Sequence, residues 1–316
     1  MRWLSTKRPI DDSEMKNVLK HGGAVVPLVT PFTAGGGLDE DALERLVAAQ
    51  VAGGVAGVFV LGTTGEGARV PADYRRRLVE LTVQHAAGRT LVYAGLGDMQ
   101  TPDVAEANEF LKAGAVAVVA HPPISQKVPV AQLSAWYEGL LNEVAGPMLL
   151  YNMPMTTGVS ISMESVGQLL GHPKLAGIKD SENDPKRQEE LLRRYGGRAD
   201  FSVFVGVGAL MEKGLKWGAD GIVPSVGNLI PAVCQELWAA AKRADWVTAE
   251  KLSGRMHSVA ALYQQGRNLN ESLAALKAAL QCRGLCSARM LPPLRKVSEL
   301  ELENIRRQMA ALDLLN

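Results

Sequence analysis

Short apolar runs alternate with longer amphipathic stretches along most of the chain. Each run has the length of a buried parallel strand, and the stretch that follows carries apolar residues at the spacing of a helix. In the first unit, Asp39 is placed to cap a helix with Leu43 and Leu46 on one face. Eight runs are expected to be strands, at Ala24–Val29, Gly57–Leu61, Thr90–Ala94, Val116–Ala120, Pro147–Tyr151, Leu175–Lys179, Phe201–Val205 and Gly221–Ser225.

Eight strand-helix units with short connections favour a parallel sheet closed into a (β/α)8 TIM barrel, an α/β fold that fits 316 residues. A doubly wound sheet is the alternative, but no complete Gly-x-Gly-x-x-Gly motif opens a helix. Beyond the eighth run the pattern predicts a C-terminal appendage of three helices, at Trp246–Tyr263, Asn270–Gln281 and Ser298–Ala311. We expect an N-terminal extension over residues 1–21, a barrel core over 22–228, and the last barrel helix with the C-terminal helical region over 229–316.

The composition limits what the protein binds. Hydrophobic residues make up 47% of the chain, and 34 lysines and arginines nearly balance 33 aspartates and glutamates. Without a strong net charge we expect neither nucleic acid nor a membrane as partner, but a small molecule. Cys282 and Cys286 lack the further ligands of a metal site, so we expect no metal. Few cysteines, and no apolar segment of a signal peptide near the N-terminus, predict a cytoplasmic location.

Polar side chains follow several predicted strands, at the end where such barrels carry their active sites. Lys179 ends the sixth run, Tyr151 ends the fifth, and Thr63 lies just beyond the second. A desolvated lysine amine can condense with a ketone to form a Schiff base, while a tyrosine hydroxyl moves the proton and a threonine relays it. Taken singly, Lys179 also suits a strand-end lysine that reaches water, and Tyr151 a half-buried aromatic residue.

The segment Gly62-Thr63-Thr64-Gly65-Glu66 is a tight polar turn directly after an apolar strand. Successive N–H groups in such a turn can hold a carboxylate, and the threonine hydroxyls add donors. The same residues also suit an ordinary helix N-terminus. Combined with a lysine and a tyrosine at one barrel mouth, the turn predicts a binding site for a keto acid.

Three motifs, in this order, resemble the signature motifs of the dihydrodipicolinate synthase and N-acetylneuraminate lyase family: Gly62-Thr63-Thr64-Gly65-Glu66, Tyr151-Asn152-Met153-Pro154 with Thr157-Gly158, and Gly177-Ile178-Lys179-Asp180. The resemblance implies a class I, metal-independent lyase that needs no cofactor beyond a covalent lysine Schiff base with pyruvate or another 2-oxo acid. It implies Lys179 as the Schiff-base lysine, Tyr151 as the proton-transfer group and Thr63 as the relay. It also implies that Gly62, Thr63 and Thr64 form the carboxylate site, that Gly206 and Val223 line the pyruvate pocket, and that the chain forms a homo-oligomer, a tetramer or dimer.

Two positions depart from the synthases of that family. Those enzymes place an arginine at the position of Thr156, where it holds the carboxylate of the aldehyde, and a threonine cannot make that bidentate contact. They also carry an aromatic pair where this chain has His121-Pro122-Pro123-Ile124. We therefore expect a lyase that joins pyruvate to a hydroxylated or short aldehyde, or splits or dehydrates such a product, of the 2-keto-3-deoxy acid or 4-hydroxy-2-oxo acid type.

Two other hypotheses stay open. 4-Hydroxy-tetrahydrodipicolinate (dihydrodipicolinate) synthase, of lysine biosynthesis, is the second, and a non-catalytic 2-oxo-acid-binding protein is the third, because a fold does not establish a function. On the first hypothesis Thr156 contacts the aldehyde. His121, beside the missing tyrosine, then acts as a substitute acid or base, or is a strand-end histidine held by a hydrogen bond.

Overall fold

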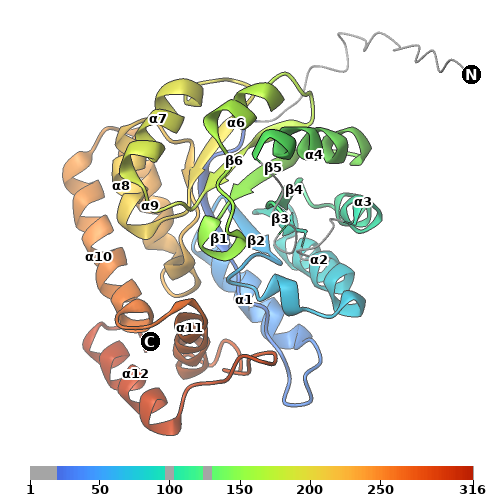
Figure 1. Ribbon diagram of the computed structural model, residues 1–316. Helices are drawn as coiled ribbons and strands as arrows, with labels where there is room; N and C mark the ends of the chain where they lie inside the picture. The colour runs from blue at the N-terminus through green and yellow to red at the C-terminus, as the bar shows by residue number, and fades with distance from the viewer. Residues whose placement is uncertain (1–19, 97–102, 124–129, 316) are drawn as a thin grey trace, which may run out of the picture.

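The computed structural model describes residues 20–96, 103–123 and 130–315. Eight parallel strands close into a barrel in sequence order, and β1 pairs with β8 to complete the ring (Figure 1). The strands are β1 (Gly23–Pro27), β2 (Gly57–Val60), β3 (Leu91–Gly95), β4 (Ala117–Ala120), β5 (Met148–Asn152), β6 (Leu175–Asp180), β7 (Ser202–Val205) and β8 (Gly221–Ile222). The predicted (β/α)8 barrel is confirmed.

Helices connect successive strands and surround the barrel. They are α1 (Glu40–Ala52), α2 (Ala72–Ala86), α3 (Val104–Lys112), α4 (Val130–Glu143), α6 (Met163–Leu169), α7 (Pro185–Tyr195), α8 (Met211–Lys216) and α9 (Pro231–Lys242), with one extra turn at α5 (Pro154–Thr157) and 3-10 turns at η1 (Gly67–Arg69), η2 (Gly208–Leu210) and η3 (Ser225–Asn228). Asp39 caps α1 as predicted, because its side chain accepts a hydrogen bond from the N–H group of Ala42.

The strands are apolar on both faces because two separate cores use them. In β2, Val58 and Val60 pack in the core between barrel and helices, whereas Phe59 points into the barrel interior. Alternate residues of a strand face opposite sides, so a strand buried on both sides is continuously hydrophobic. This explains why the strands are visible in the sequence as short apolar runs.

The eighth strand is shorter than predicted. It ends at Ile222, and Ser225 begins the turn η3 rather than ending the strand. Pro224 has no N–H group for a strand ladder. Beyond the end of β8, the Asn228 side chain supplies hydrogen bonds to the chain at the end of β1. It accepts from Val29 N (3.1 Å) and donates to the carbonyl oxygen of Pro27 (2.9 Å).

The N-terminal end of the barrel is closed by a small hydrogen-bonded floor. His21, at the predicted end of the extension, is buried there with Nδ1 2.7 Å from the hydroxyl of Tyr93. Its backbone N–H group donates to Ser202 Oγ (2.9 Å). Buried polar contacts of this kind join the segment before β1 to β3 and β7 at this end of the barrel.

Three helices follow the last barrel helix, and the predicted appendage is confirmed. They are α10 (Trp246–Gln264), α11 (Leu269–Cys282) and α12 (Glu299–Ala311). Figure 1 shows them on the side of the barrel away from α3 and α4, with α11 between α12 and the barrel. None of the described helices is long and apolar enough to cross a membrane.

Candidate active site

Lys179 and Tyr151 lie side by side at the C-terminal end of the barrel, because they are paired in the register of β5 and β6. The amine of Lys179 lies 3.9 Å from the centre of the Tyr151 ring and 4.9 Å from that of Phe59. Lys179 is only 7% exposed. The adjacent Asp180 does not neutralise it, since that carboxylate pairs with Arg187 at 2.9 Å. The result is a buried amine held against the faces of two aromatic rings.

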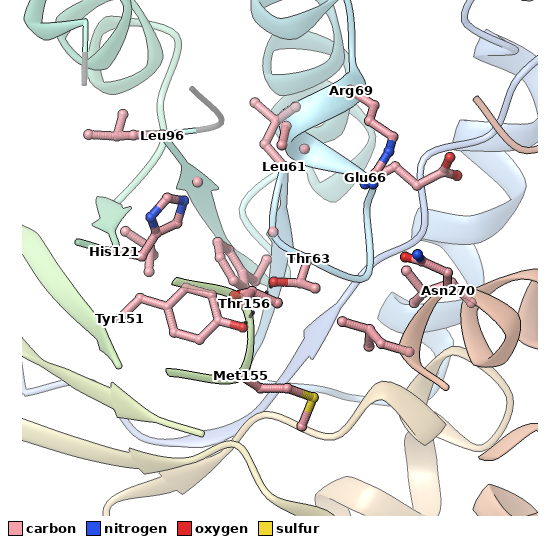
Figure 2. Close-up of a pocket in the computed structure, with 18 of the residues that line it drawn as sticks. Leu61, Thr63, Glu66, Arg69, Leu96, His121, Tyr151, Met155, Thr156 and Asn270 are labelled. Carbon is pink, nitrogen blue, oxygen red and sulfur yellow. Dashed lines mark hydrogen bonds between the residues drawn. The ribbon is translucent and has the colours of Figure 1, made fainter. Parts of the chain in front are cut away.

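Thr63 places a second hydroxyl group next to that of Tyr151. Its Oγ1 lies 3.2 Å from the hydroxyl of Tyr151, although the two residues come from different strands of the barrel (Figure 2). Burial opposes ionisation of Tyr151, but the charge of Lys179 and hydrogen bonds to neighbouring side chains outweigh burial and lower the pKa of the phenol. Such a phenol is suited to give up and take back a proton.

The turn after β2 is strained and tightly packed. Leu61 and Glu66 both have left-handed backbone conformations, with φ of 59° and 56°, and each costs about 1–3 kcal/mol. Between them, Gly65 N donates to the carbonyl oxygen of Gly62 (3.0 Å). A side chain at Gly67 would meet the Leu61 carbonyl oxygen at 1.9 Å, so only glycine fits. Strain of this kind persists where surrounding contacts hold it.

The same turn presents free donors. Within the described parts of the chain, the N–H groups of Thr63 and Thr64 have no recorded acceptor, whereas those of Gly65 and Glu66 bond within the turn. Thr64 is half-buried beside Thr63. Two adjacent unused donors, in a turn whose Thr63 contacts Tyr151, are suited to hold the carboxylate of a 2-oxo acid.

Gly206 and Val223 both lie near Lys179, and their place in a pyruvate pocket stays a prediction. A Cβ at Gly206 would lie 2.1 Å from Ser181 Oγ and 3.2 Å from Lys179 Cε, so a larger residue would displace both side chains. Val223 and Lys179 border an apolar void of about 20 Å³ in the barrel interior. An apolar void of this kind stays dry, so the amine of Lys179 has little contact with water on this side.

Asp180 is a residue whose role the sequence reasoning missed. It is fully buried, and it accepts hydrogen bonds from Asn152 Nδ2 (3.0 Å) and Arg187 Nε (2.9 Å). Burial raises the pKa of Asp180 against the opposing effect of Arg187. Asp180 thereby ties the ends of β5 and β6 together behind Tyr151 and Lys179, and its position beside the lysine is the only signal in the sequence.

A cavity of about 640 Å³ opens above Tyr151. His121 and Thr156 both line it, and their contact with a substrate stays a prediction. Thr156 donates its hydroxyl to the carbonyl oxygen of Met153 (3.1 Å), which leaves the hydroxyl oxygen free to accept. Ile124, in the segment where the synthases of the family carry an aromatic pair, lies outside the described residues.

His121 is held in one orientation. Its Nδ1 lies 2.7 Å from the carbonyl oxygen of Pro122, and a carbonyl can only accept, so Nδ1 carries the proton and Nε2 a lone pair. Burial lowers the pKa of His121, against the effect of backbone hydrogen bonds, and favours the neutral ring. Both outcomes predicted for this residue are thus compatible with its position, because it is hydrogen-bonded and it still faces the cavity.

Arg69 and Asn270 also line the cavity and were not anticipated. They come from η1 and α11, and Figure 2 shows them beyond the turn and across from Tyr151, respectively. Reasoning from strand ends cannot find them, because neither follows a strand directly. Arg69 is exposed, and among the described residues no carboxylate pairs with it. The cavity therefore has a cation at its rim.

No cluster of histidine, cysteine and carboxylate side chains within the described ranges is arranged to bind a metal. The absence of a metal and of a cofactor stays a prediction.

A closed barrel with a buried lysine beside a tyrosine, and a threonine in contact with that tyrosine, carries the groups that Schiff-base chemistry needs. The chain belongs to the dihydrodipicolinate synthetase family, whose family model matches residues 20–312, and it is a lyase. It is 32% identical to the 4-hydroxy-tetrahydrodipicolinate synthase of Exiguobacterium sibiricum, over 88% of this chain and 93% of that one. It is 33% identical to the synthase of Phenylobacterium zucineum, over 88% and 92%.

Solved structures agree. Dihydrodipicolinate synthase from Aquifex aeolicus superposes with a TM-score of 0.85 at 27% identity, over 93% of this chain and 99% of that one. The prophage protein YagE of E. coli K12, solved in complex with pyruvate, superposes with a TM-score of 0.84 at 25% identity, over 93% and 99%. The expected family is confirmed. The names of the curated relatives favour the synthase, our second hypothesis, over the aldolase.

Proposed function

We propose that the protein forms a Schiff base between Lys179 and pyruvate and then joins this three-carbon unit to an aldehyde, or catalyses the reverse cleavage. The observation that carries the proposal is the contact of the buried Lys179 amine with Tyr151, whose hydroxyl lies 3.2 Å from Thr63. A desolvated amine without a paired carboxylate is the form of lysine that serves as a nucleophile.

The steps follow from these positions. The deprotonated form of the Lys179 amine adds to the keto carbon, and the carbonyl oxygen leaves as water after it takes a proton from Tyr151, whose phenolate Thr63 stabilises. The resulting iminium ion withdraws electrons from the methyl carbon, which gives a proton to the Tyr151 phenolate and becomes an enamine. The enamine carbon bonds to the aldehyde carbon, and the aldehyde oxygen takes that proton from Tyr151, which recovers it when the product is hydrolysed. Water then releases the product from Lys179.

For the second substrate we propose a neutral, hydroxylated or short aldehyde. Thr156 offers only a hydroxyl oxygen where a charged substrate group needs an arginine, and the His121 ring is neutral with a free lone pair. Both groups are suited to hydroxyl donors on the aldehyde.

The synthase is the second candidate. It is supported by the names of the curated relatives and by Arg69 at the cavity rim, which could bind a carboxylate in place of the missing arginine. On this reading the aldehyde is aspartate semialdehyde.

Borohydride trapping with pyruvate tests the shared first step. We expect a pyruvate-derived adduct on Lys179 and none on Lys174, located by peptide mass spectrometry. If Lys179 stays unlabelled with pyruvate and with longer 2-oxo acids, the proposal fails.

A substrate comparison then separates the two candidates. Pyruvate is supplied with glyceraldehyde or glyoxylate in one assay and with aspartate semialdehyde in the other. Consumption of only the last pair, with a rise in its KM in Arg69→Gln, establishes the synthase and overturns the aldolase.

The homo-oligomer, tetramer or dimer, and the cytoplasmic location stay predictions. A monomeric dihydrodipicolinate synthase variant has a similar fold, with a TM-score of 0.85 at 27% identity, over 97% of this chain and 100% of that one.

A further inference from the structure

A buried ion pair joins the turn after β2 to the C-terminal appendage. Lys277 on α11 and Glu66 at the end of the turn are each at most 1% exposed, and Lys277 Nζ lies 2.5 Å from Glu66 Oε1. The second carboxylate oxygen of Glu66 accepts the N–H group of Leu291 (2.9 Å). Lys277 also donates to the carbonyl oxygen of Arg289 (2.7 Å). The turn is thus attached to a helix and to the segment that follows it.

Stability alone gives a poor account of this pair. Charges buried this deeply lose their hydration, and apolar residues of the same shape often stabilise a protein equally well or better. Burial lowers the pKa of Lys277 even though Glu66 opposes the shift. Unlike apolar residues, the pair fixes the position of the Glu66 backbone, because the carboxylate of Glu66 is hydrogen-bonded to Lys277 and to Leu291.

That position matters for the reacting groups. Glu66 is left-handed with φ of 56°, a conformation that a non-glycine residue leaves unless it is held. Its N–H group donates to the carbonyl oxygen of Thr63 (3.2 Å), and Thr63 in turn contacts Tyr151. Figure 2 shows the Glu66 side chain directed away from Tyr151, on the far side of the turn. A rotation at Glu66 would therefore move Thr63.

We propose that Glu66 and Lys277 are positioning residues, which hold the strained turn so that the Thr63 hydroxyl stays in contact with Tyr151 and the unused N–H groups of Thr63 and Thr64 keep their place in the turn. The proposal rests on the proposed function, because it assigns the pair to the same site. It makes the C-terminal appendage part of the active-site architecture, although among the described residues of that appendage none contacts Lys179 through a hydrogen bond or ion pair.

Three variants test the proposal: Glu66→Gln, Lys277→Met and the double variant E66Q/K277M. Each single variant leaves one buried charge without its partner, so both the melting temperature and kcat fall. The double variant leaves no unpaired charge, so we expect its melting temperature to recover. Its kcat should stay about 10- to 100-fold below that of the wild type, because small misplacements of reacting groups cost about that much. If a single variant does not fold, the double variant carries the test.

Ile305→Ala is the matched control. Ile305 is buried on α12, where a cavity lowers the melting temperature without contact to the turn. We expect it to lose stability and keep its kcat, measured well below its melting temperature.

The outcomes separate this inference from the proposed function. Recovery of both melting temperature and kcat in the double variant overturns the inference, because the pair then only stabilises the fold. Failure of pyruvate and borohydride to label wild-type Lys179 overturns the proposed function instead. Labelling of Lys179 in E66Q/K277M at a reduced rate, with normal folding, supports both.

Discussion

Two tyrosines inside the same barrel show how the surroundings of a buried phenol set the direction of its pKa shift. Tyr151 near the mouth and Tyr93 near the floor are both almost fully buried and belong to one interior core. Each hydroxyl has a polar neighbour, since Tyr151 contacts Thr63 at 3.2 Å and Tyr93 contacts His21 at 2.7 Å. Burial nevertheless raises the pKa of Tyr93, whereas the pKa of Tyr151 is lowered.

The difference comes from a cation. Burial acts on both phenols in the same direction, but only Tyr151 has a lysine amine against its ring. At the floor, burial also lowers the pKa of His21 and favours its neutral form, so Tyr93 gains no compensating charge. One barrel therefore contains two buried tyrosines whose pKa values shift in opposite directions, and Lys179 accounts for the difference.

Removing the cation should have the largest effect. In Lys179→Met the nucleophile is lost, and we expect kcat to fall at least about a thousandfold. The same change should raise the pKa of Tyr151, because the charge of Lys179 is removed. The difference in ultraviolet absorbance between K179M and K179M/Y151F during a pH titration should place the ionisation of this phenol at a higher pH than the matching difference between the wild type and Y151F. The control is Lys174→Met. Lys174 lies directly before β6 and donates to a backbone carbonyl oxygen, that of Val144, so this variant should retain activity and labelling of Lys179. Retention of a tenth of the wild-type kcat in K179M would contradict the assignment.

Removing one hydroxyl should have a smaller effect. Tyr151→Phe keeps the ring against Lys179 but loses the proton carrier, so we expect kcat to fall about 10²- to 10⁴-fold while the borohydride adduct still forms. Tyr93→Phe is the matched control at the floor. It should keep its kcat but lose about 1–3 kcal/mol of unfolding free energy in denaturant titration, because His21 Nδ1 is left without its partner. Equal losses of kcat in both variants would remove the distinction between the two tyrosines.

The sequence predicts the mouth of this barrel far better than its floor. Lys179, Tyr151 and Thr63 could be placed together because parallel strands deliver the residues at their ends to one mouth. The contact between His21 and Tyr93 could not, because it depends on which face of β3 points inward and on a residue before the first strand. Which side chains point into a barrel depends on the stagger of the hydrogen-bond register between neighbouring strands, and the apolar runs do not reveal that register.

Long-range partners were also beyond the sequence. Glu66 and Lys277 are 211 residues apart, and no local pattern indicates that α11 reaches the turn after β2. Arg69 and Asn270 reach the cavity from elements that follow no strand directly. The early end of β8 has a local cause, Pro224. The hydrogen bond from the Asn228 side chain to the carbonyl oxygen of Pro27, which lies beyond the end of this strand, could not be predicted from the sequence.

The smallest predicted effect concerns the pH dependence of the floor. Burial lowers the pKa of His21 below its unfolded value of about 6.5, so the unfolded chain binds the proton more readily. The stability that this histidine contributes is therefore fully present above about pH 6.5 and is lost as the pH falls through its folded pKa, by at most about 1.4 kcal/mol per pH unit. Denaturant titrations between pH 8 and 5 should show a steeper loss for the wild type than for His21→Gln. The comparison with the variant is needed because burial also lowers the pKa of His121 and His172. Because the floor lies at the opposite end of the barrel from Lys179, the variant should leave kcat unchanged at every pH. Parallel stability curves for the two proteins would contradict a lowered pKa of His21 in the folded protein.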